Sequence, residues 1–144
     1  MSLVLQHEPV VDWEAGTRLC NAGYSAINEQ RRNASLHDLE SDGLMALDAG
    51  QHALFLAQIH KTFRTPEVLL QQGESEVIWH GRGKLEIPLE STIQEQLVDL
   101  SSPSHPHERG TLLNPDAVRM GIGTKILYSR EGLYLILVCR IRTH

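Results

Sequence analysis

The chain has 144 residues, of which 41% are hydrophobic and 22% charged, and its formal net charge is −5 at pH 7. This length is enough to bury a full core without disulfide or metal staples, and the composition is typical of a soluble globular protein. The weak acidity argues against nucleic acid as the main partner, because the chain offers no broad attraction to phosphate backbones. A membrane-spanning helix needs a run of about 18 apolar residues, and the sequence has no such run.

Two helices are predicted in the first half of the chain. The first ends near Arg32 and carries a stripe of small or apolar residues at helical spacing, formed by Leu19, Ala22, Gly23, Ala26 and Ile27. A short polar connector is expected over residues 33–41. The second helix is predicted over residues 42–61 and is apolar over most of its circumference, which indicates central burial. Gly50 in its middle costs about 1 kcal/mol relative to alanine, and close approach of a neighbouring element would explain it.

The middle of the chain is polar and contains glycine, with less regular structure predicted. A short strand is expected over residues 77–79. Thr92 and Glu95 form a capping-box signature, which predicts the start of a short third helix. Pro103 and Pro106 are expected to end that helix, because proline lacks the N–H group and clashes with the preceding turn.

The last part of the chain has the pattern of a β-hairpin. Residues 121–129 and 133–142 are rich in Ile, Leu, Tyr and Val, and Glu131-Gly132 lies between them as a tight turn. Both faces of the second strand are apolar, so both need cover, and helices are the only cover available. The sequence therefore predicts an α+β fold with helices on both faces of a small antiparallel sheet.

Neither the cysteines nor the basic C-terminal residues point to catalysis. Cys20 and Cys139 match no zinc motif, and their positions in a predicted helix and a predicted core strand favour inert packing over reactivity. Two buried thiols or a single disulfide remain the alternatives. Arg140, Arg142 and His144 form a small positive edge, which we interpret as a solvated strand end that discourages edge pairing.

Four segments are similar, in order, to the motifs of one protein family. The first two are Asn28-Glu29-Gln30-Arg31, which resembles an N-x-x-R opening, and Met45, Ala49, His52 and Ala53, which resemble an L-x-x-x-A-x-x-H-A helix. The third is Gly73-Glu74-Ser75, which resembles a Gly-Glu-Asn motif with Ser in place of Asn. The fourth is Ser102-Pro103-Ser104-His105, followed by Leu112-Leu113-Asn114-Pro115 and Gly121-Ile122-Gly123, which resembles an S-P-x-H-R-x-x-L-L-x-P…G-I-G block. Together they resemble the CAP superfamily of cysteine-rich secretory, antigen 5 and pathogenesis-related proteins, and its bacterial members in particular.

This resemblance implies a three-layer α-β-α sandwich with a cleft on one side. It implies that residues 1–144 form a single CAP (SCP-like) domain, with residues 1–11 as an extended N-terminal segment. Residues 1–9 lack the basic and the apolar region of a signal peptide. An exported protein, which is secreted, periplasmic or at the cell surface, is therefore expected with its signal sequence already trimmed.

In many members of the family the cleft holds two histidines and two acidic side chains, and some members bind a divalent metal there. Imidazole and carboxylate groups suit Zn²⁺ or similar ions, and metal-bound water is a nucleophile near neutral pH. Glu74 matches the glutamate of the Gly-Glu-Asn motif. The alternative for Glu74 is that it only ties down a loop by accepting hydrogen bonds from backbone N–H groups.

One histidine of the cleft is expected at His105 or His107. His105 fits the S-P-x-H spacing, whereas counting back from Leu112 places the position at Glu108, one residue from His107. Residues 106–110 are therefore expected to be an insertion or a reshaped loop. One of the two histidines is expected to face the cleft, and two solvated loop histidines are the alternative.

The remaining cleft positions match less closely. The position of the other histidine falls at Arg64 or Thr65, and His60 lies about one turn earlier. His52 is interpreted as a packed helix residue, and Asp99 is the nearest candidate for the second acidic side chain.

Two hypotheses of function follow. The first is an exported or cell-surface binding module without catalytic activity, whose shallow cleft takes a small ligand, a lipid or a protein partner and is lined by Glu74, His105, His107 and His60. The second is a peptidase-like hydrolase that depends on Zn²⁺ or another divalent metal. In it Glu74 is a ligand or the general base, His107 or His105 is a ligand, and His60 or another group completes the shell. If the resemblance misleads, an unrelated α+β domain with helices on one face of the sheet is expected.

Overall fold

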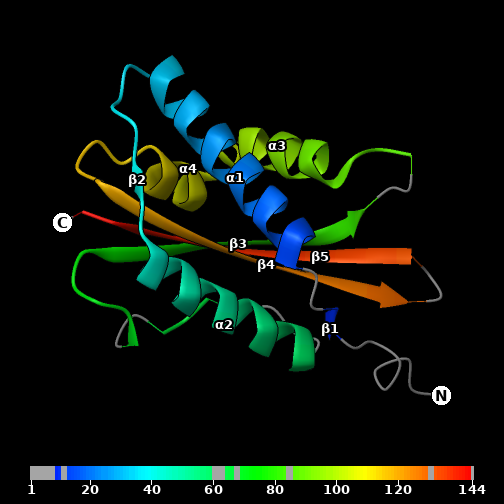
Figure 1. Ribbon diagram of the computed structural model, residues 1–144. Helices are drawn as coiled ribbons and strands as arrows, with labels where there is room; N and C mark the ends of the chain where they lie inside the picture. The colour runs from blue at the N-terminus through cyan, green and yellow to red at the C-terminus, as the bar shows by residue number, and fades with distance from the viewer. Residues whose placement is uncertain are drawn as a thin grey trace.

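The computed structural model describes residues 9–10, 13–59, 64–66, 69–83, 86–129 and 132–143. Within these ranges the chain forms a sheet with helices on both sides (Figure 1). In chain order the elements are β1 (Pro9–Val10), α1 (Trp13–Asn33), β2 (Glu40–Ser41), α2 (Gly43–Ile59), β3 (Glu74–Gly83), α3 (Leu89–Leu100), α4 (Pro106–Leu112), β4 (Arg119–Ser129) and β5 (Gly132–Arg142). None of the helices in the described ranges has the length and hydropathy needed to cross a membrane. Of the expected N-terminal segment, residues 9–10 form β1, and residues 1–8 and 11 lie outside the described residues.

The C-terminal hairpin forms the centre of the sheet. The strand order is β1-β4-β5-β3, and each pair along it is antiparallel. β2 adds a short parallel pairing to β4, in which Glu40 lies opposite Arg119. The predicted hairpin is confirmed, with Ser129 paired to Gly132 next to the turn, whereas Glu131 lies outside the described residues.

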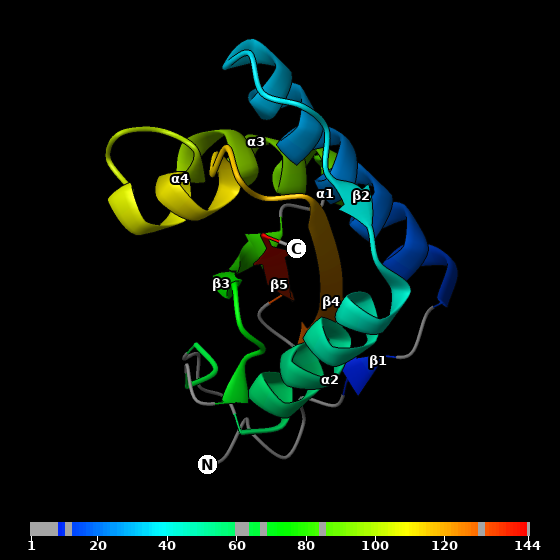
Figure 2. The same cartoon turned by 90° about the vertical axis from the view of Figure 1, so that its left-hand side faces the viewer.

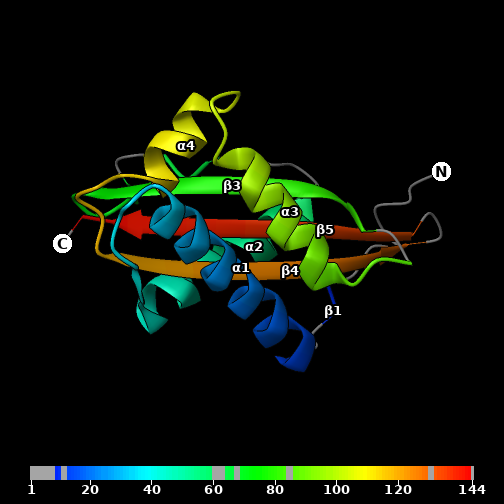
Figure 3. The ribbon, with the colours of Figure 1, turned by 90° about the horizontal axis from the view of Figure 1, so that it is seen from above.

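Helices cover both faces of the sheet, which confirms the predicted three-layer sandwich. α2 lies against one face, and α1 and α3 cross the opposite face (Figure 2). On β5, Leu137 and Cys139 belong to the core beneath α1 and α3, whereas Ile136 and Val138 belong to the core beneath α2. Apolar side chains that alternate along one strand therefore contribute to two separate cores. α4 is placed differently, beside the edge strand β3 (Figure 3).

The close approach expected near Gly50 exists, but the glycines that allow it lie on β4. A Cβ atom at Gly121 would stand 2.3 Å from the backbone nitrogen of Ala46, and one at Gly123 would stand 2.2 Å from that of Gly50. Any side chain at these two positions would collide with the backbone of α2, so the helix rests directly on β4. A Cβ atom at Gly50 itself would meet nothing within 4 Å.

The capping box expected at Thr92 is wrong. α3 begins at Leu89, its N-cap is Pro88, and no side chain caps its first turn. Thr92 is buried inside the helix, because the helix starts one turn earlier and Leu89 packs against the core. The start of the helix therefore lies one turn before the residue that the sequence pattern marks.

The segment expected to be an insertion or a reshaped loop is the helix α4. Pro106, expected to end a helix, stands in the first turn of α4 and follows the N-cap His105. Proline is well tolerated there, because the first N–H groups of a helix have no partner within it. α4 brings residues 106–112 alongside β3, which the loop interpretation does not predict.

Two residues of the N-x-x-R segment hold the connector after α1. Asn28 and Leu39 exchange two hydrogen bonds, from Asn28 Nδ2 to the Leu39 carbonyl at 3.2 Å and from the Leu39 N–H to Asn28 Oδ1 at 2.8 Å. Arg31 is fully buried, and its Nη1 donates to the carbonyls of Leu112 at 3.0 Å and Asn114 at 2.9 Å. The end of α1 is thereby tied to the end of α4.

Both cysteines are free thiols, which resolves the alternatives left by the sequence. Cys20 donates from Sγ to the carbonyl of Ile122 at 3.4 Å, and Cys139 is fully buried in the sheet. Burial raises the pKa of both thiols above the ordinary value for cysteine. A raised pKa keeps a thiol protonated and unreactive, as expected for packing residues.

Candidate functional site

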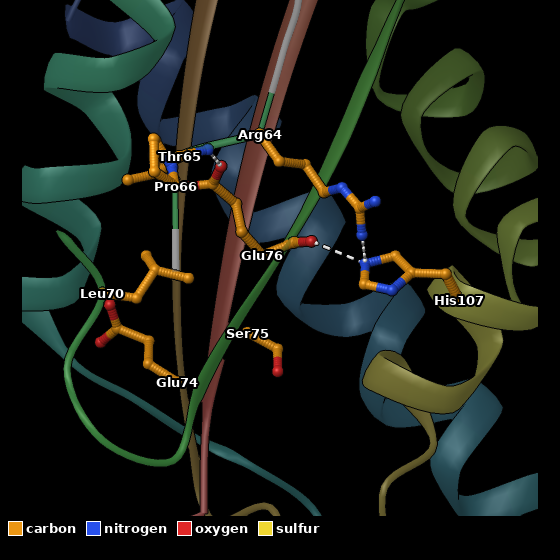
Figure 4. Close-up of a pocket in the computed structure, with 8 residues that line it drawn as sticks. All are labelled: Arg64, Thr65, Pro66, Leu70, Glu74, Ser75, Glu76 and His107. Atoms are coloured by element: carbon orange, nitrogen blue, oxygen red, sulfur yellow. Dashed lines mark hydrogen bonds between the residues drawn. The ribbon is translucent and has the colours of Figure 1, made fainter. Parts of the chain in front are cut away.

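A pocket of about 430 Å³ opens beside the first residues of β3, between the segment that follows α2 and the helix α4 (Figure 4). Its lining is polar for the most part and comes from four stretches of the chain. The lining residues are Arg64, Thr65, Pro66, Leu70, Glu74, Ser75, Glu76 and His107. A volume of this size is within the range of small-molecule sites.

Glu76 is the buried acidic residue at the back of this pocket. Its side chain is 1% exposed, and it accepts hydrogen bonds from the Thr65 N–H at 2.6 Å, the Thr65 hydroxyl at 2.9 Å and Arg140 Nε at 2.9 Å. Arg140 Nη2 also donates to Thr65 Oγ1 at 3.2 Å, and His52 Nε2 lies 3.6 Å from Glu76 Oε1. A buried carboxylate is stable only when paired and hydrogen-bonded, and Glu76 meets both conditions.

Glu74 lies two residues earlier on the same face of β3 and has the same kind of partner. It stands opposite Arg142 on β5, and Arg142 Nη2 donates to Glu74 Oε2 at 3.0 Å. Its side chain is 4% exposed. Strand pairing thus gives each of the two carboxylates its own arginine from the neighbouring strand.

His107 reaches the pocket from α4, on the other side of β3. Its Nε2 lies 3.2 Å from the backbone carbonyl oxygen of Glu76, which faces outward because β3 is an edge strand. The same Nε2 contacts Nη1 of Arg64, as the dashed lines in Figure 4 show. The helix that the sequence pattern does not predict therefore delivers a pocket residue.

The structure brings together only some of the site residues expected from the sequence. Glu74 and His107 both line the pocket. His105 does not line it, and its Nε2 lies 3.0 Å from Asp99 Oδ2 in an exposed pair near the end of α3. His60 lies outside the described residues.

The interpretation of the basic C-terminal residues as a solvated strand end is wrong. Arg140 is 9% exposed and Arg142 is partly buried, and both compensate pocket carboxylates. His144 lies outside the described residues. The sequence could have indicated that the two carboxylates lie together. Side chains alternate between the faces of a strand, so Glu74 and Glu76 share a face if the strand begins at Glu74 and not at residue 77.

The pocket residues do not fit the divalent metal that the family resemblance implies. Zinc sites generally use three or more protein ligands, and among the described residues no group of three His, Cys, Asp or Glu side chains could hold a metal ion. Glu74 and Glu76 are each bonded to an arginine, and the guanidinium of Arg64 stands against the Nε2 of His107. A cation thus occupies the space beside the one histidine that lines the described pocket.

Solved structures of other proteins share the fold of this chain. No family model matches the sequence, and no curated protein matches it significantly. An outer surface protein from Borrelia burgdorferi has a TM-score of 0.63 and 21% identity, with 96% of this chain and 98% of that chain covered. Ancylostoma-secreted protein Ac-ASP-7 has a TM-score of 0.60 and 15% identity, with 94% and 72% covered. NaASP2, whose crystal structure contains Zn²⁺, has a TM-score of 0.64 and 9% identity, with 93% and 84% covered.

These similarities extend over nearly the whole chain and concern its architecture. The layers and the strand order define an α-β-α sandwich with a polar pocket beside its edge strand. The chain has the fold of the CAP superfamily, as its sequence motifs imply.

Proposed function

We propose that this chain is an exported or cell-surface binding module without catalytic activity, which takes its ligand in the pocket beside β3. The single observation that carries the proposal is the pairing of both pocket carboxylates with arginines, Glu76 with Arg140 and Glu74 with Arg142. A carboxylate held in this way is a fixed structural anion and is not available as a metal ligand or general base.

The same observation weighs against the metal-dependent hydrolase. Such a hydrolase needs a shell of protein ligands around the ion, and the described pocket supplies His107 with Arg64 beside it. The placement outside the cell is supported by structures of the same fold, one of an outer surface protein and one of a secreted protein.

The binding proposal is tested with a variant that fills the pocket. Ser75 is exposed and lines the pocket, so Ser75→Trp should block it without disturbing the core, whereas Gln94→Trp on the exposed face of α3 is the matched control. Both variants and the wild type are screened by thermal shift against a panel of small anionic, cationic and neutral compounds. We expect the compounds that raise the Tm of the wild type and the control to lose their effect with Ser75→Trp.

A catalytic function has its own test. Metal-free protein is titrated calorimetrically with zinc beside Glu74→Ala, and we expect no stoichiometric binding in either. Micromolar zinc binding that Glu74→Ala abolishes, or hydrolysis of a peptide or ester that Ser75→Trp abolishes and Gln94→Trp retains, would overturn the proposal in favour of the hydrolase.

A further inference from the structure

Arg64 is the one pocket-lining arginine, and its charge has no acidic partner within the described part of the chain. The two pocket carboxylates are already paired with other arginines, since Glu76 accepts a hydrogen bond from Arg140 and Glu74 accepts one from Arg142. These two pairs leave no net charge between them. Arg64 is exposed, and its side chain contacts the ring of His107.

One ring nitrogen of His107 is shared by a hydrogen-bond acceptor and a hydrogen-bond donor, and it cannot form a hydrogen bond with both. His107 Nε2 lies 3.2 Å from the carbonyl oxygen of Glu76, which only accepts hydrogen bonds, and also contacts the guanidinium of Arg64, which only donates. One ring nitrogen either carries a proton and donates to the carbonyl, or lacks it and accepts from Arg64. When it donates to Glu76, the N–H of Arg64 that faces the pocket has no acceptor.

A further donor and apolar side chains line the same pocket. The hydroxyl of Ser75 lines the pocket, is exposed and has no hydrogen-bond partner among the described residues. Pro66 and Leu70 supply apolar lining. The site thus combines a cation, a hydroxyl and a small apolar wall in a space of about 430 Å³.

We propose that the pocket binds a small oxyanion, the carboxylate or phosphate group of a small molecule, with Arg64 as its main partner and the Ser75 hydroxyl as a further donor. The planar guanidinium matches the geometry of both groups and binds them through paired, charge-assisted hydrogen bonds. This inference rests on the proposed function that the pocket is a binding site, and it names the ligand class. Because the whole chain carries a net charge of −5, general attraction cannot replace this local charge.

The experiment is a titration of the full chain with inorganic phosphate and, separately, with butyrate, followed by calorimetry at constant ionic strength. Sodium chloride serves as the blank, because salt screens exposed charges. Three proteins are compared: the wild type, Arg64→Gln, and Arg32→Gln as the control for loss of an exposed arginine that pairs with Asp38. The two titrants show whether phosphate or carboxylate is preferred.

We expect saturable binding of at least one titrant to the wild type and to Arg32→Gln, weakened about tenfold or more in Arg64→Gln with an unchanged Tm. Arg64→Lys should recover part of the affinity, since it restores the charge without the planar fork. Absence of saturable binding to the wild type, or equal affinity in Arg64→Gln, would overturn the inference.

This failure is distinguishable from failure of the proposed function. If a neutral or cationic compound binds the wild type and is lost in Ser75→Trp but not in Arg64→Gln, the pocket is a binding site and the oxyanion is wrong. If no compound of any charge responds to Ser75→Trp, the binding function itself fails.

Discussion

Arg140 lies directly opposite Glu76 in the ladder of β3 and β5, and its Nε donates to Glu76 Oε2 at 2.9 Å. Two residues along the same face, Arg142 lies opposite Glu74 and forms the second pair. Directly opposed side chains on an antiparallel pair are close enough to interact, so the register alone brings these charges together. The charged side chains of the pocket are therefore held in place by the pairing of β3 with β5.

Replacement of Arg140 by methionine should be strongly destabilising. The change leaves the Glu76 carboxylate buried and unpaired, and we expect the free energy of unfolding to fall by about 3 kcal/mol in urea denaturation. The double variant Glu76→Gln with Arg140→Met should recover part of this loss, because the uncompensated charge is then removed. Arg32→Met, which breaks an exposed pair with Asp38, should cost less than about 1 kcal/mol. Equal losses in the two single variants would show that burial of the pair does not matter.

Two glycines that face each other across α2 and β4 should respond in opposite directions. Gly123→Ala would drive a Cβ atom into the backbone of α2, and we expect it to lower the stability by about 1–3 kcal/mol. Gly50→Ala meets no neighbour within 4 Å, and the better helix propensity of alanine should raise the stability by about 0.5–1 kcal/mol. Chemical denaturation of both variants checks the pair. Stabilisation by Gly123→Ala would contradict the direct contact between helix and strand.

The fold could be predicted from the sequence because its signals are local. The hairpin follows from two apolar runs, and both faces of residues 133–142 are apolar, which already requires two covering layers. α4 could not be predicted in the same way, because Pro106 is compatible both with the end of one helix and with the first turn of another.

The pocket could be predicted only in part, because its partners come from distant segments. Motif spacing indicates Glu74 and His107, whereas Arg140 pairs with Glu76 only through the register of two strands 64 positions apart. No local sequence pattern predicts the register in which these two strands pair. The role of Arg64 likewise depends on where α4 places His107, which is 43 positions away.

Asp42 should make the stability depend on pH in the acid range. Its Oδ1 accepts from the N–H groups of Met45 at 3.1 Å and Leu44 at 2.9 Å at the start of α2, and Arg119 Nη1 lies 3.3 Å from Oδ2. The hydrogen bond from Met45, with those from Arg119 and Leu44, lowers the pKa of this carboxyl below its ordinary value. A lowered folded pKa stabilises the protein above the unfolded pKa, and this contribution is lost as the pH falls through the folded value.

Asp42→Asn tests this dependence, because asparagine can still cap the helix but carries no charge. We expect the wild type to have the higher Tm at neutral pH, and the difference between the two proteins to shrink as the pH falls below about 4. Thermal unfolding at a series of pH values measures it. A difference that stays constant into strong acid would show that the charge of Asp42 makes no contribution.

The two thiols should react little or slowly with thiol reagents in the native protein. Burial raises the pKa of Cys139, so that little reactive thiolate is present, and Cys20 is partly buried with a raised pKa as well. A thiol reagent should label Cys139 only after denaturation and Cys20 slowly before it, with two thiols counted in the unfolded chain without reductant. A count of zero in the non-reduced, unfolded protein would mean that the cysteines are paired.

The strands at the middle of the sheet come last in the chain order of the described elements. β4 begins at Arg119 and β5 ends at Arg142, yet β1, β2, β3 and α2 all pack or pair against this hairpin. While the chain is still being made, its earlier helices therefore have no sheet to cover and keep their apolar faces open to chaperones. The sandwich therefore depends on contacts between this hairpin and elements much earlier in the chain, and such non-local contacts slow folding.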